Sequence, residues 1–138
     1  MKLIDPQSRQ ADLLLVVDDE EQVCVIMKQM LEGMGFCVLT CTDAAGAIST
    51  YQRHQAKIAL VITDMLMPFM DGSALIQALL KINPWVLIIA MSGFPGQRAR
   101  AEQVGGPDIL WLPKPFTVKE LEDRIHVFLP PRRQPKSV

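Results

Sequence analysis

The chain has 138 residues, of which 49% are hydrophobic and 21% are charged. A chain of this length is expected to form one domain with a substantial hydrophobic core. Its 14 Lys and Arg residues against 15 Asp and Glu give a formal net charge of −1, which argues against a dedicated nucleic-acid binder and against a long disordered acidic or basic chain.

Five apolar runs predict β-strands, and they cover residues 13–17, 36–41, 58–62, 86–91 and 109–112. The first, third and fourth runs are continuous rather than alternating, which is typical of strands buried on both faces of a parallel sheet. Each run is far shorter than the roughly 20 apolar residues that a membrane span needs. We therefore expect no membrane insertion, no signal peptide and, by default, a cytoplasmic location.

Segments with helical spacing of apolar residues separate these runs. Glu20 and Glu21 open the first segment, where acidic side chains suit the helix dipole, and glycines at 33 and 35 close it. Asp43 is the predicted N-cap of the second helix. The third segment stops before the Asn-Pro pair at 83–84, and residues 97–103 form a short polar segment. Thr117 and Glu120 have the spacing of a capping box at the start of the last helix.

The alternation of strand and helix, repeated five times, predicts a doubly wound α/β domain. The run at 36–41 is followed by few groups suited to binding, which favours a peripheral position for this strand. That position gives a flavodoxin-like parallel sheet in the order 2-1-3-4-5. We expect an N-terminal extension at 1–11, one domain at 12–129 and a flexible C-terminal tail at 130–138.

Charged and hydroxyl side chains follow four of the five strands. Asp18 and Asp19 follow the first, Asp64 the third, Ser92 the fourth and Lys114 the fifth. Ligands of open α/β sheets bind at the carboxyl ends of the strands, so these side chains should meet at one edge. Clustered carboxylates repel one another, and a hard cation such as Mg²⁺ relieves that repulsion.

The same residue types suit phosphoryl transfer. An Asp carboxylate is a known covalent phosphoryl acceptor. The Lys114 ammonium can neutralise an anion as a point charge, and the Ser92 hydroxyl can donate to its oxygens. Phosphoryl transfer depends mainly on such positioning and charge neutralisation. The pattern therefore predicts a site that accepts a phosphoryl group.

Four sequence pieces in this order resemble the receiver domain of the two-component response-regulator family. They are LLLVVDDE (13–20), VITDMLMPFMDG (61–72), IIAMSG (88–93) and LPKPF (112–116). The resemblance covers roughly residues 12–129, and it looks closest to receivers of hybrid histidine kinases or to stand-alone single-domain regulators. Because only nine residues follow position 129, we expect either a single-domain regulator or a receiver taken from a larger hybrid kinase.

The resemblance implies roles for the acidic residues. Asp64 matches the phosphoacceptor, and its partner would be a histidine kinase or a histidine phosphotransfer protein that presents phosphohistidine. Asp18 and Asp19 match the acidic pair that binds Mg²⁺, with Asp19 as the direct ligand and Asp18 acting through water. Leu66, two residues after the acceptor, would offer its backbone carbonyl to the metal. The chain would carry out its own phosphoryl transfer and dephosphorylation and no other enzymatic reaction.

The resemblance also implies a conformational switch. Ser92 matches the hydroxyl residue that contacts the phosphoryl group, and Lys114 matches the lysine that pairs with it through a typically cis bond to Pro115. Trp111 matches the switch aromatic, although Tyr or Phe is usual there. The output face would be helix 4, strand 5 and helix 5, and a homodimer, if one forms, would use the same face. No direct contact with nucleic acid is expected.

Three alternatives follow from the residues. A phosphorylation-independent protein-binding module would not need the acidic residues and the lysine. An aspartyl phosphatase would need an acid where Leu66 stands, and a flavin protein would need a phosphate loop where the acidic pair would repel phosphate. The three cysteines, at positions 24, 37 and 41, are expected to be small buried hydrophobes without a disulfide.

Overall fold

The computed structural model describes residues 12–67, 72–93 and 109–131. The short polar segment at 97–103 and residues 68–71 lie outside the described residues. Within the described residues, strands and helices follow one another as β1 (Leu13–Val17), α1 (Glu21–Gly33), β2 (Cys37–Cys41), α2 (Ala44–His54), β3 (Ile58–Asp64), α3 (Gly72–Ile82), β4 (Ile88–Ser92), β5 (Ile109–Pro113) and α5 (Val118–Phe128).

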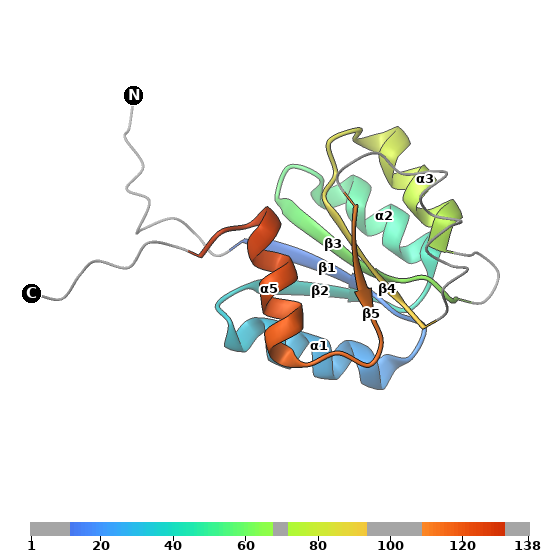
Figure 1. The fold of residues 1–138 in the computed structure, drawn as a ribbon. Coiled ribbons are helices and arrows are strands. Elements are labelled where there is room, and N and C mark those ends of the chain that lie inside the picture. The colour runs from blue at the N-terminus through green and yellow to red at the C-terminus, as the bar shows by residue number, and fades with distance from the viewer. Residues whose placement is uncertain (1–11, 68–71, 94–108, 132–138) are drawn as a thin grey trace, which may run out of the picture.

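The five strands form one sheet in the order β2-β1-β3-β4-β5, and all neighbouring pairs are parallel. The predicted order is therefore confirmed. The chain passes from β1 outward to the edge strand β2 and then returns to β3 on the other side of β1 (Figure 1). This reversal makes the carboxyl ends of β1 and β3 the switch point of the fold, where doubly wound proteins bind ligands.

Helices cover both faces of the sheet, with α1 and α5 on one face and α2 and α3 on the other (Figure 1). Alternate residues of β1 enter different cores. Leu15 and Val17 pack with the residues of α2 and α3, whereas Leu14 and Val16 pack with those of α1 and α5. All four side chains are fully buried. Burial on both faces explains why β1 is a continuous apolar run rather than an alternating one.

The predicted helix ends are confirmed. The Asp43 side chain accepts a hydrogen bond from the Gly46 amide and so caps α2. At α5, the Thr117 hydroxyl accepts from the Glu120 amide and the Glu120 carboxylate accepts from the Thr117 amide, both at 3.1 Å. After α1, Gly35 has a φ of +100°, a backbone conformation that favours glycine.

Two sequence-based expectations need correction. β4 begins at Ile88, two residues after the start of the apolar run at 86. Cys37 is exposed and Cys41 is half-buried, so the prediction that all three cysteines are buried was correct only for Cys24. The reason is that Cys37 and Cys41 lie on the edge strand β2, which has a neighbouring strand on only one side. All three thiols are free, as expected.

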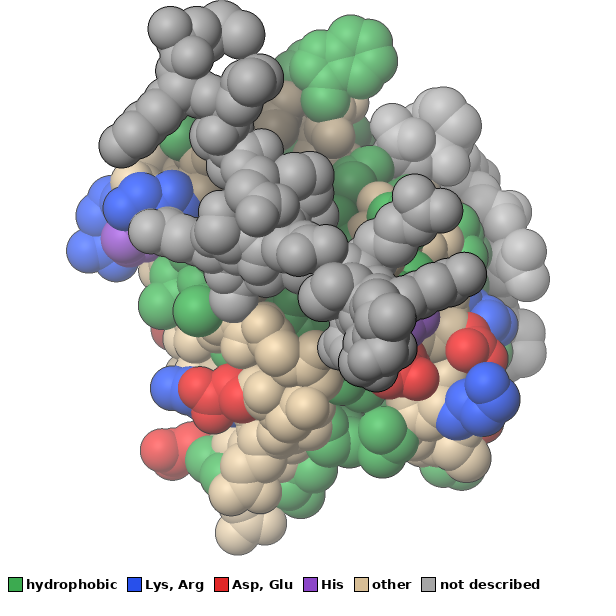
Figure 2. Space-filling view, turned by 90° about the vertical axis from the view of Figure 1, so that its left-hand side faces the viewer, with side chains coloured by type: hydrophobic (Ala, Val, Ile, Leu, Met, Phe, Trp, Pro, Cys, Tyr) green, Lys and Arg blue, Asp and Glu red, His purple; other side chains and the backbone are tan. Residues whose placement is uncertain are grey.

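On the face that Figure 2 presents, the acidic and basic side chains of the described residues are interspersed with hydrophobic ones. Among the described helices, none has the length and apolar character needed to cross a bilayer.

Candidate functional site

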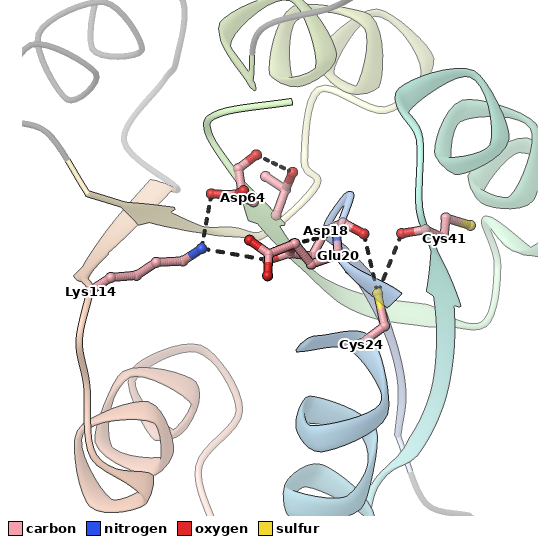
Figure 3. Close-up of polar contacts among 7 residues, drawn as sticks. Asp18, Glu20, Cys24, Cys41, Asp64 and Lys114 are labelled. Atoms are coloured by element: carbon pink, nitrogen blue, oxygen red, sulfur yellow. Dashed lines mark hydrogen bonds and ion pairs between the residues drawn. The ribbon is translucent and has the colours of Figure 1, made fainter. Parts of the chain in front are cut away.

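The carboxyl ends of three strands bring the predicted acidic residues and the lysine together (Figure 3). Asp18 and Asp19 follow the last residue of β1, and Asp64 is the last residue of β3. Lys114 follows the last residue of β5 and reaches toward both strands. Its Nζ lies 3.2 Å from Asp64 Oδ1 and 3.5 Å from Asp18 Oδ2. The convergence at this edge is as the sequence predicted.

The two neighbouring aspartates of the β1–α1 turn have different environments. Asp18 is completely buried, whereas Asp19 is exposed. Asp18 Oδ1 accepts a hydrogen bond of 2.9 Å from the Glu20 amide. Burial raises the pKa of Asp18, and the negative charge of Asp64 raises it further, while the Glu20 amide and the Lys114 ammonium lower it. The net effect is a raised pKa, so the charged form of Asp18 is costly in this site.

Lys114 is the cation that this acidic cluster holds. Burial by itself lowers the pKa of Lys114, but the negative charges of Asp64 and Asp18 together outweigh burial and raise it. The side chain is about one third exposed. Lys114 is therefore charged at neutral pH and partly compensates two carboxylates at once.

The donor set fits a hard divalent cation. One carboxylate oxygen from each of Asp18, Asp19 and Asp64 lies within 4.8 Å of the others. The buried Asp18 Oδ2 has no hydrogen-bond donor among the described residues, although the Lys114 ammonium lies nearby. Three carboxylates facing one lysine leave a local excess of negative charge. Mg²⁺ prefers such oxygen ligands, usually with several retained waters.

Comparison with known proteins identifies the family. Residues 14–126 match the family model of the response regulator receiver domain. The chain belongs to this family. It is similar to a probable transcriptional regulator, ycf27, of Porphyridium aerugineum, with 33% identity over 122 residues. That match covers 87% of this chain and 49% of the relative, so the chain spans about half the length of the first curated relatives it matches.

Solved structures show the same fold. The receiver domain of the hybrid histidine kinase CckA matches with a TM-score of 0.72 and 26% identity, covering 85% of this chain and 98% of that one. The receiver domain of a Pseudomonas aeruginosa sensor histidine kinase, solved with magnesium in its active-site cleft, matches with a TM-score of 0.77 and 24% identity. That alignment covers 86% of this chain and 98% of that one.

Membership of the family gives the general class of the chain, which is a receiver domain of two-component signalling. Receiver domains are generally non-enzymatic signalling modules, and they interact with histidine kinases and phosphotransfer proteins. Receiver domains bind Mg²⁺ at an acidic site, and the cluster of Asp18, Asp19 and Asp64 fits a phosphoacceptor function.

The structure places the other predicted residues of the receiver at or near this edge. Ser92 ends β4 and is half-buried, and its carbonyl accepts a 2.9 Å hydrogen bond from the Lys114 amide. The bond from Lys114 to Pro115 is cis. Leu66 is two residues past Asp64, and its side chain is 60% exposed. Its predicted carbonyl contact with a metal stays a prediction.

Trp111 lies in the middle of β5, opposite Ala90 of β4. Its indole is partly buried against the core of α2 and α3. Its carbonyl accepts a 2.9 Å hydrogen bond from Arg124 Nε of α5, so the backbone at this position is tied to α5. Its role as the switch aromatic stays a prediction.

Sequence reasoning missed two residues that support the site. The buried Thr63 hydroxyl donates to the Asp64 carbonyl at 3.0 Å. Cys24, one turn into α1, places its thiol 3.4 Å from the Asp18 carbonyl oxygen. Burial raises the pKa of this thiol, and the charge of Asp18 raises it further. Thr63 lies within the matching piece at 61–72 and Cys24 lies outside the four matching pieces, and only their position next to the acidic residues could have drawn attention to them.

Proposed function

We propose that Asp64 accepts a phosphoryl group from phosphohistidine, in a reaction that requires Mg²⁺. The observation that carries this proposal is the convergence of Asp64, Asp18, Asp19 and Lys114 on one edge of the sheet. Asp64 is 7% exposed, so its carboxylate is shielded but still reachable. A nucleophile that must meet a charged donor in a defined orientation needs both properties.

The metal would be held by Asp18, Asp19 and Asp64, with the Leu66 carbonyl as a further ligand and Asp18 acting through water. When bound, Mg²⁺ neutralises the carboxylates and the phosphoryl oxygens so that two anions can approach each other. The buried Asp18 Oδ2 supports this assignment, because it has no hydrogen-bond donor in the described part of the chain and its cationic neighbour at 3.5 Å, Lys114, is shared with Asp64, so a further cation would compensate the remaining charge. The related Pseudomonas receiver, which contains magnesium in its cleft, has the same fold.

In the proposed step, an Asp64 carboxylate oxygen attacks phosphorus and forms an acyl phosphate. The bond between phosphorus and the imidazole nitrogen of the donor breaks, and its electron pair stays on the imidazole. Lys114, now 3.2 Å from Asp64, would pair with the new phosphoryl oxygens. The Ser92 hydroxyl would donate to another of these oxygens. Hydrolysis of the acyl phosphate would return the free aspartate.

An apolar groove beside the site supports docking of a protein donor. The groove has a volume of about 720 Å³ and lies between α1 and the segment after β5. Lys114 is part of its wall together with Val23, Ile26, Met27, Met30, Pro115 and Phe116. Ile26 is 54% exposed, and the neighbouring Val25 is 50% exposed. A histidine kinase or a histidine phosphotransfer protein that covers this face would bring its phosphohistidine toward Asp64.

The proposed output is a shift of the face formed by helix 4, β5 and α5 after Ser92 moves toward the phosphoryl group. Trp111 would respond because β5 pairs directly with β4. A homodimer through the same face and a cytoplasmic location belong to the proposal as well. The helix 4 segment of this face lies outside the described residues.

The phosphoacceptor proposal is tested by intact-mass measurement after incubation with Mg²⁺ and a small acyl phosphate donor. We expect the wild type to gain one phosphoryl group, and both Asp64→Asn and a sample with EDTA to gain none. Asp123→Asn, which removes an exposed carboxylate on α5, should react like the wild type. A wild type that stays unmodified would favour a phosphorylation-independent binding module. An equal gain in Asp64→Asn would place the acceptor elsewhere.

A further inference from the structure

The buried thiol of Cys24 lies directly behind the acidic site, where β1 and β2 end (Figure 3). Cys24 is only 3% exposed. Its Sγ lies 3.4 Å from the Asp18 carbonyl oxygen and 3.7 Å from the Cys41 carbonyl oxygen. Carbonyl oxygens only accept hydrogen bonds, so the thiol must be the donor in this arrangement.

Three hydrogen bonds close a ring around the turn that joins β1 to α1. The Glu20 amide donates to Asp18 Oδ1, the Cys24 amide donates to the Glu20 carbonyl at 3.2 Å, and the Cys24 thiol donates to the Asp18 carbonyl. Asp19 is the residue of this turn between Asp18 and Glu20. The N-cap residue of α1, Glu20, makes no side-chain capping bond. The Cys24 thiol therefore connects α1 by a side-chain hydrogen bond to the β1–α1 turn, which contains Asp18 and Asp19.

Cys41, the cysteine that contacts Cys24, is not placed to form a disulfide with it. Cys41 Sγ contacts the Thr50 hydroxyl at 3.3 Å, toward α2. In Figure 3 the Cys41 sulfur points away from Cys24, whose contact with that residue is through the carbonyl oxygen. The two sulfurs are thus held on different sides of the sheet, and a disulfide between them would require the strand end to rearrange.

We propose that Cys24 is a positioning residue for the Mg²⁺ site. By holding the Asp18 backbone, its thiol sets the directions in which the Asp18 and Asp19 carboxylates point. This inference rests on the proposed function, because it concerns the same acidic pair. Groups that orient metal ligands often change metal affinity by 10–100-fold when they are removed. A thiol is a weak donor and acts here on the backbone, so we expect an effect of about 3–10-fold.

The test measures the dissociation constant of Mg²⁺ by calorimetric titration of the full chain. Cys24→Ala, which removes the donor, should raise the constant about 3–10-fold. Cys24→Ser, which restores a donor, should stay within about twofold of the wild type. Cys37→Ala removes an exposed thiol from β2 and should also stay within twofold.

A second control separates positioning from general stability. Leu31→Ala removes a fully buried side chain from the same helix, away from the turn, and should destabilise the protein more than Cys24→Ala. It should nevertheless leave the Mg²⁺ constant within about twofold, because the β1–α1 turn is intact.

Three results would overturn the inference. If Cys24→Ala binds Mg²⁺ as tightly as the wild type, or if Cys24→Ser and Cys24→Ala lose Mg²⁺ affinity equally, the role of Cys24 is overturned and the proposed function is not. A wild type that binds no Mg²⁺ would overturn the metal site of the proposed function and this inference together.

Discussion

Replacing Asp18 by asparagine should stabilise the metal-free protein, although Asp18 is a proposed metal ligand. Asp18 is completely buried, and Asp64 faces it with a like charge. Asparagine has nearly the same shape, and its Oδ1 can still accept from the Glu20 amide. The substitution therefore removes a buried charge while it preserves the packing and the hydrogen bond of the turn.

The size of the effect follows from the distances. The carboxylate oxygens lie within 4.8 Å of one another, and two like charges at that largest separation repel by about 3.5 kcal/mol at an effective dielectric constant of about 20. At the same dielectric constant, Lys114 at 3.5 Å attracts Asp18 by about 4.7 kcal/mol. Repulsion from Asp64, screened repulsion from exposed Asp19 and the desolvation of Asp18 together exceed this attraction. We expect a net gain of about 1–2 kcal/mol in the free energy of unfolding.

The pH dependence of the gain has a defined sign. The pKa of Asp18 is raised in the folded state from its ordinary value of 3.8. The folded protein then binds this proton more tightly than the unfolded chain does, so the charged carboxylate costs stability above the folded pKa. Below pH 3.8 this cost is absent. The advantage of Asp18→Asn should therefore be larger at pH 7 than in acid and should shrink as the pH falls toward 3.8.

The assay is urea unfolding at pH 7, once in EDTA and once in Mg²⁺. In EDTA, Asp18→Asn should unfold at a higher urea concentration than the wild type. Added Mg²⁺ should stabilise the wild type more than the variant, because the variant lacks one carboxylate. Asp123→Asn, on the surface of α5, should change stability by less than about 0.5 kcal/mol. A variant that is less stable than the wild type in EDTA would show that the attraction of Lys114 dominates, and would refute the reasoning.

Three further predictions concern other parts of the molecule. Lys114→Met should lower the unfolding free energy in EDTA by about 1–3 kcal/mol, which is less than the loss of a fully buried ion pair because the lysine is partly exposed. Added Mg²⁺ should recover most of this loss. As a control, Lys119→Met removes one partner of an exposed ion pair and should change the unfolding free energy by less than about 1 kcal/mol. Gly72→Ala should lower the free energy of unfolding, measured in urea, by about 1–3 kcal/mol, because the added Cβ would lie 2.7 Å from the Cα atom of Met65, the residue after β3. Gly33→Ala, whose Cβ meets no atom within 4 Å, should be neutral or stabilising. Thr117→Ala should lower the unfolding free energy by about 1 kcal/mol through loss of the capping box, and an unchanged urea midpoint would contradict that role.

The alternation of strands and helices could be predicted because its signals are local. A doubly buried strand such as β1 must be apolar at every position, and a capping box needs two residues three apart in the sequence. The same reasoning predicted the meeting of Asp64 and Lys114, since parallel strands present their carboxyl ends at one edge. Exact strand starts were less predictable, because the apolar run at 86–91 includes residues that precede the first ladder pair of β4.

The sequence by itself therefore determined the class of fold, the edge that carries the chemistry and the residues that meet there. Only the tertiary structure decided that Asp18 is buried while the adjacent, identical Asp19 is exposed, and that Lys114 contacts two carboxylates. It also decided that the Cys24 thiol lies 3.4 Å from the Asp18 carbonyl oxygen. The physical reason is range: periodicity and capping act over a few neighbouring residues, whereas burial and charge pairing depend on distances between strands that only sheet twist and helix packing set.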